Sequence, residues 1–87
     1  MSPARVRLPA DLDSLVRSKM LVCIEEANLG QFDTTVAKRY LIDQYAQIDI
    51  AAELGCVRQT VAERVPRILD KVRLAAIELG YLNPTEY

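Results

Sequence analysis

The chain has 87 residues, of which 51% are hydrophobic and 26% are charged, with 11 Lys and Arg, 12 Asp and Glu, and no His. This length and apolar content indicate one packed domain, and a net charge of −1 argues against intrinsic disorder. Without His, the commonest general base and metal ligand is missing, so we expect no enzyme, no metal and no cofactor.

The domain organisation predicted from the sequence is simple. Residues 1–10 are expected to form a flexible arm bounded by prolines, and residues 11–87 a single helical domain. No apolar run reaches the roughly 18 residues of a membrane span, and the N-terminus lacks the apolar segment of a secretory signal. Cys23 and Cys56 occupy apolar helical positions, which is typical of buried free thiols. We therefore expect a cytoplasmic protein without a membrane partner.

Two helices are predicted in the first half of the domain. The first begins at Asp11 or Asp13, which are good N-caps, and stops before Gly30. The second begins near Asp33-Thr34-Thr35, which offer several N-cap oxygens, and fades at 43–45. The apolar residues that define the two faces are Leu12, Leu15, Val16, Met20, Cys23, Ile24 and Ala27, followed by Val36, Ala37, Tyr40 and Leu41.

The second half predicts a short helix and a long apolar stripe. The short helix covers residues 47–54 and ends at Gly55, with Ile48, Ala51 and Leu54 on one face and Ile50 alongside. The stripe covers residues 58–79 and is closed by Gly80. No sustained alternation predicts strands. The expected fold is all-α, a small bundle of four to five helices that contains a helix-turn-helix.

Pro66 interrupts the last stretch. Inside a helix it removes one backbone hydrogen bond and costs about 3 kcal/mol. One solution ends a helix near Val65 and starts a C-terminal helix over about 66–80, with proline in its first turn. The other solution is one continuous, kinked helix. The sequence leaves both open.

Residues 47–65 carry the pattern of a helix-turn-helix. Ala51 is small where the second helix must approach closely, and Gly55 can adopt the left-handed conformation of a tight turn. The apolar residues expected between the two helices are Leu54, Cys56 and Val61, and Val65 extends that face by one turn. An ordinary helical hairpin that touches no DNA would share this pattern and stays an alternative.

The polar side chains left outward on the second helix predict contacts with duplex DNA. Arg58 is the expected principal base reader, Gln59, Glu63 and Arg67 are secondary readers, and Arg64, Lys71 and Lys38 are expected on phosphates. Residues 58–73 hold five cations and two carboxylates, a local balance of +3, whereas the rest of the chain is negative. Positive charge is thus concentrated where the motif predicts phosphate contact.

Residues 37–68 resemble the DNA-binding segment of the TrfB/KorA repressors of plasmids. The match includes Leu41-Ile42-Asp43, Gln47, Ala51, Leu54-Gly55, Arg58, Val61, Val65 and Arg67. The resemblance implies a helical, plasmid-type repressor that binds a palindromic operator as a homodimer, with base readers at Arg58, Glu63 and Arg67. Glu63 departs from the amide of that family. A looser similarity to the sigma-factor region that reads the −35 element covers residues 48–73.

A second hypothesis comes from a different functional class. The helix-turn-helix could serve as a protein-interaction module that modulates a polymerase subunit, a nuclease or a partner regulator. The acidic pI of about 5.3, Glu63 and Pro66 favour it, whereas Arg58 and the positive segment favour DNA. Substituting Arg58 by Ala distinguishes the two hypotheses, because it should abolish only DNA binding.

Overall fold

The computed structural model describes Leu12 and residues 15–82, and this part of the chain is helical without strands. Its elements are α2 (Arg17–Glu26), α3 (Gln31–Ala37), the π-helical segment η1 (Lys38–Ile42), α4 (Gln47–Leu54) and α5 (Arg58–Glu78). The predicted all-α fold class, a small helical bundle, is confirmed. Asp11, Asp13 and the predicted arm over residues 1–10 lie outside the described residues.

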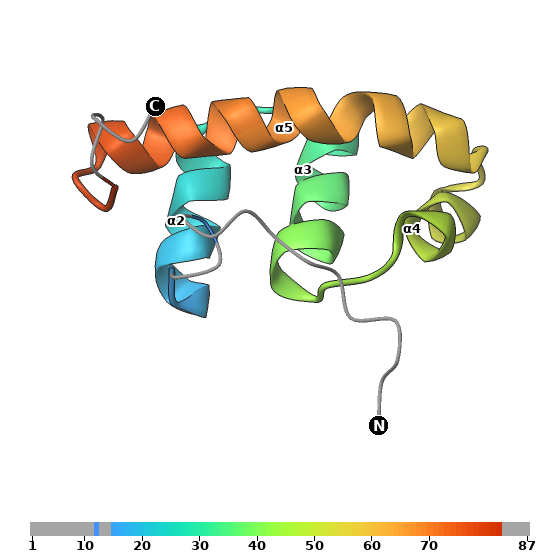
Figure 1. Cartoon of the computed structure of the whole chain (residues 1–87), viewed down its shortest axis with the longest axis horizontal. Helices are drawn as coiled ribbons and strands as arrows, with labels where there is room; N and C mark the ends of the chain where they lie inside the picture. The colour runs from blue at the N-terminus through green and yellow to red at the C-terminus, as the bar shows by residue number, and fades with distance from the viewer. Residues whose placement is uncertain (1–11, 13–14, 83–87) are drawn as a thin grey trace.

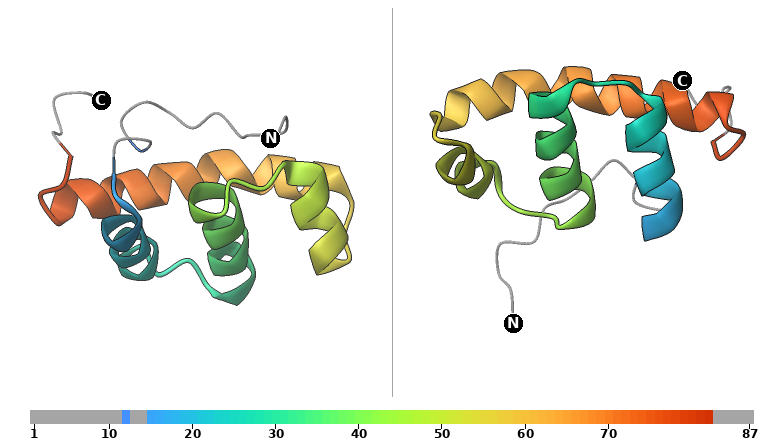
Figure 2. Two further views of the ribbon diagram at one scale, coloured as in Figure 1. Left: turned by 90° about the horizontal axis from the view of Figure 1, so that it is seen from below. Right: turned by 180° about the vertical axis from the view of Figure 1, so that it is seen from behind.

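The long helix α5 organises the molecule (Figure 1). Its 21 residues correspond to about 32 Å of helix. Helix α2 and the continuous rod of α3 and η1 stand beside each other against one side of α5, and α4 lies at its N-terminal end (Figure 2). One side of α5 is therefore covered along its length, and the other is left outward.

The core forms where these helices meet α5. Its fully buried larger side chains are Leu12, Ile24, Ile50, Ile68, Val36, Val61, Val72 and Cys23. The spacing of Val61, Val65, Ile68 and Val72 at three- and four-residue steps places them on one face of α5. Burial of this face holds α5 against the other helices.

Two apolar residues expected in the core are exposed. Helix α2 begins at Arg17, later than predicted, and Val16 is its N-cap with 58% of its surface exposed. Ile48 is 57% exposed, whereas Ile50 is completely buried. The periodicity of α4 allowed either residue to face inward. Its packing against α5 selects the face that carries Ile50 and Ala51.

The start of α3 also differs from the prediction. The helix begins at Gln31, and its N-cap is Gly30 with φ of 91°. Asp33 was expected among the capping residues near the start of this helix. Instead it lies in the first turn, and its side chain bonds to Arg64 of α5. The ion pair with Arg64 thus engages the carboxylate that the local sequence pattern assigned to an N-cap.

Helix α5 continues through Pro66, so a separate C-terminal helix over about 66–80 is wrong. Pro66 is exposed, and its ring therefore faces solvent and meets no packed helix. The missing backbone N–H leaves the carbonyl of Ala62 without its usual helical donor. Val65 and Ile68, which flank Pro66 on the buried side, keep the two halves packed as one rod.

Candidate nucleic-acid interface

Helices α4 and α5 form the predicted helix-turn-helix arrangement. Helix α4 has the predicted bounds, and Gly55 follows it with φ 72° and ψ 30°, the left-handed conformation. The N–H of Cys56 donates to the carbonyl of Ala51 at 3.0 Å and closes the turn. The two helix axes cross at a steep angle (Figures 1 and 2). Val61 is buried between the helices as expected.

The outward side of α5 carries three of the predicted DNA-contacting residues. Gln59, Glu63 and Arg67 are spaced at four-residue steps, are exposed and lie opposite the buried stripe. The Nε2 of Gln59 donates to the Oε2 of Glu63 at 3.1 Å, which orients the carboxylate toward the start of the helix. Arg58 is exposed at the first position of α5, directly after the turn.

Arg64 forms an ion pair with the buried Asp33, although its own side chain is 43% exposed. Its Nε donates to Oδ1 of Asp33 at 2.6 Å, and its Nη2 donates to Oδ2 at 2.9 Å. Asp33 is 7% exposed and is the one buried charged residue in the described part of the chain. The hydrogen bond to Asp33, followed by the charge of Asp33, raises the pKa of Arg64 above its usual value. Arg64, expected on a phosphate, therefore joins α5 to α3.

Three cations of α5 are left without such partners. Arg58, Arg67 and Lys71 are exposed and make no ion pair with any residue that the structure describes. By contrast, Arg73 pairs with Asp70 at 3.4 Å in the second half of the helix. The unpaired positive charge of α5 thus lies at positions predicted to contact DNA.

Lys38 lies apart from this group. Lys38 belongs to η1, which packs against α2 and α4. In the rod formed by α3 and η1, η1 is the end that lies away from α5 (Figures 1 and 2). It lines a hollow of about 130 Å³ together with Arg17 and Arg39. Arg39 donates to Glu53 and Asp43, and these hydrogen bonds raise its pKa, with Glu53 contributing most. The structure does not bring Lys38 to the outward side of α5.

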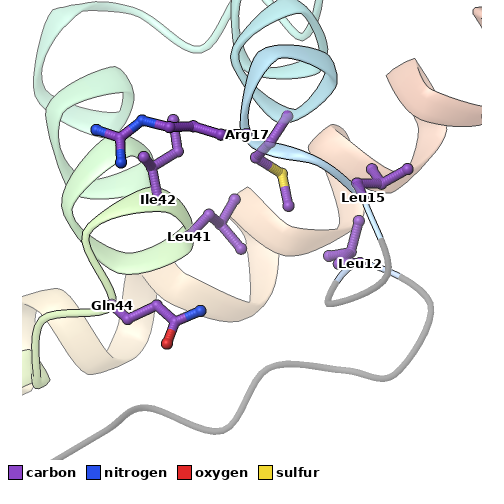
Figure 3. A pocket seen from close by; sticks show the side chains of 7 residues that line it. Leu12, Leu15, Arg17, Leu41, Ile42 and Gln44 are labelled. Atoms are coloured by element: carbon purple, nitrogen blue, oxygen red, sulfur yellow. The ribbon is translucent and has the colours of Figure 1, made fainter.

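Two further hollows lie on the surface. Thr60, Glu63, Arg64 and Arg67 line an open one of about 240 Å³ on α5. The other, of about 140 Å³ between α2 and η1, is lined mainly by apolar side chains, with Arg17 and Gln44 at its edge (Figure 3).

The described residues contain no group of three or more His, Cys, Asp or Glu side chains placed to hold a metal ion. None of their helices combines the length and the apolar character needed to cross a membrane.

Comparison with known proteins adds no relative. No family model, no curated protein and no solved structure matches this chain. The resemblance to the TrfB/KorA repressors and to the sigma-factor region therefore stays a prediction. The part of the chain that the structure describes is a small all-helical domain, whose helix-turn-helix presents on its second helix three cations without an ion-pair partner among these residues.

Sequence reasoning missed two residues that shape this surface. Asp33 and Phe32 of α3 flank the guanidinium of Arg64, the ring centroid of Phe32 at 5.7 Å. Asp33 and Arg64 are 31 residues apart, and no periodicity relates them. Their approach depends on how α3 packs against α5, which a single sequence does not specify.

Proposed function

We propose that this chain is a sequence-specific, duplex-DNA-binding transcription regulator that reads the major groove with the N-terminal half of α5. One observation carries the proposal. Except for Arg64, the cations of α5 that were predicted to contact DNA have no ion-pair partner among the described residues. Exposed, unpaired Arg and Lys side chains are what phosphates and guanine edges attract.

The width of the major groove suggests which residues of α5 contact bases and which contact phosphates. The major groove is about 12 Å wide, which corresponds to about eight residues of a helix that crosses it. Arg58, Gln59 and Glu63 fall within such a length from the start of α5 and are the proposed base readers. Arg67 and Lys71 lie beyond it, where the flanking phosphates would be. Arg64 supports the orientation of α5 instead of contacting DNA.

The biological setting of the proposal rests on the sequence resemblance. We propose a cytoplasmic repressor that binds a palindromic operator as a homodimer. A small number of unpaired cations per chain supports two-chain binding, because the phosphate contacts of two chains add.

The alternative is a protein-interaction module on the same scaffold. One observation favours it: Arg64 pairs with Asp33, and Arg73 pairs with Asp70. Two of the five cations of residues 58–73 are thus less available to phosphates. In this case the outward side of α5 would dock on a protein, and Arg58 would contribute little.

Fluorescence anisotropy of the purified chain tests the proposal. Duplexes from upstream of its own gene are compared with scrambled duplexes at two salt concentrations. Arg58→Ala should lose about 1–3 kcal/mol of specific binding free energy, because a bidentate arginine–guanine contact is lost. Arg17→Ala is the matched control, because Arg17 is an exposed arginine of α2, its side chain 72% exposed.

The salt dependence provides a second readout. Lys71→Ala should reduce the slope of log affinity against log salt by about 0.9 and should weaken binding to all duplexes alike. Equal binding to genuine and scrambled DNA, or none, would reject the proposal and favour the protein-interaction alternative.

A further inference from the structure

Val57 is the most exposed large apolar residue in the described part of the chain. It occupies the turn between α4 and α5, and 68% of its surface is accessible. Arg58 and Gln59, the first two proposed DNA-contacting residues, follow it directly in the sequence. An apolar side chain thus stands in solvent beside the proposed base readers.

The same residue is a poor choice for the start of α5. Val57 is the N-cap, with φ −84° and ψ 155°, and no side-chain hydrogen bond caps the helix. Ser, Thr, Asp or Asn at this position would accept a hydrogen bond from an N–H of the first turn, which valine cannot do. Valine at this position therefore contributes little buried surface and no capping hydrogen bond to the folded state.

We propose that Val57 is a specificity-determining residue that packs its side chain against the 5-methyl group of a thymine in the major groove. The inference rests on the proposed function. The thymine methyl is the apolar group that the base edges present in this groove, and small apolar side chains contact it. Valine suits the role because its β-branched side chain is stiff and loses little rotamer freedom on contact.

Methyl-deleted DNA tests this contact. In a duplex that the chain binds specifically, each thymine is replaced in turn by deoxyuridine, which lacks only the methyl group. For the unaltered protein, at least one replacement should lower affinity about fourfold, the effect of one buried methyl-sized group. For Val57→Ala the same replacement should have a clearly smaller effect, because the shortened side chain retains little of the contact.

Two control variants separate the contact from general effects. Leu74→Ala removes another exposed apolar side chain of α5, about 24 Å along the helix from Arg58, and should keep the full sensitivity to deoxyuridine. Val57→Ser introduces a capping oxygen and should raise the urea midpoint of unfolding while abolishing that sensitivity. Loss of discrimination in a more stable variant cannot come from misfolding.

The outcomes distinguish this inference from the proposed function. Specific binding without any response to deoxyuridine, or an equal response in Val57→Ala, overturns the role of Val57 and leaves the proposed function intact. Replacement of cytosines by 5-methylcytosine adds the same methyl group elsewhere. If affinity changes only in those duplexes, and not when thymine is replaced by deoxyuridine, the assignment to thymine is overturned. Absence of specific duplex binding overturns both.

Discussion

Replacing Pro66 by Ala should stabilise the protein. Alanine restores the N–H that can donate to the carbonyl of Ala62 and removes the crowding of the ring, a gain of about 3 kcal/mol in a helix interior. Loss of proline also makes the unfolded chain more flexible, which costs about 0.4–1 kcal/mol. Pro66 is exposed, so no packing is lost. The free energy of unfolding should rise by about 2 kcal/mol, the difference between these two effects.

Urea unfolding and thermal melting measure this change. For a domain of this size, about 2 kcal/mol corresponds to a rise in Tm of about 8–16 °C. Glu78→Ala, an exposed substitution near the end of α5, is the control and should change stability by less than about 0.5 kcal/mol. A Pro66→Ala protein no more stable than the original would refute the reasoning, because α5 would then accommodate the proline without loss.

Further substitutions test the turn, the core and the buried thiol. Gly55→Ala should cost about 1–2 kcal/mol in urea unfolding, because a Cβ there meets no neighbour and only the left-handed backbone is strained; Gly55→Asn should cost less. Ile50→Ala should cost about 2–5 kcal/mol, whereas Ile48→Ala should be nearly neutral, and equal effects would contradict the observed face of α4. Burial raises the pKa of the Cys23 thiol above its value in the unfolded chain. The contribution of this thiol to the free energy of unfolding is therefore complete below about pH 8.5 and is lost as pH rises through the folded-state pKa. Cys23→Ala should show a smaller decline in urea midpoint between pH 7 and 10.

The helix-turn-helix could be predicted from the sequence because its constraints are local. Gly55 must supply a left-handed residue between two helices, and small or apolar residues must stand at fixed distances from it. Helix α4 accordingly has the predicted bounds, and Val61 is buried as expected. The exposed position of Glu63 follows from the same register, whereas Arg58 is exposed at the first position of α5.

The features that could not be predicted are those that tertiary packing decides. Ile48 and Ile50 have similar local patterns, and the contact of α4 with α5 selects Ile50. Pro66 was compatible with either an end or a continuation of the helix, and burial on both of its sides selects continuation. The partner of Arg64 could not be foreseen, because Asp33 lies 31 residues earlier.

The pairing of charges explains how an acidic chain can present a cationic surface. Asp33, Asp43 and Glu53 are each engaged by an arginine within the fold, so their charges are offset before any partner approaches. The net charge of −1 therefore says little about α5, where Arg58 at the helix start and Arg67 on the outward side have no acidic partner among the described residues. In the proposed DNA complex, the pairing with Asp33 would draw Arg64 away from phosphates and lower the number of phosphate contacts per chain. Two chains on one operator would restore that number, which is the physical argument for a homodimer.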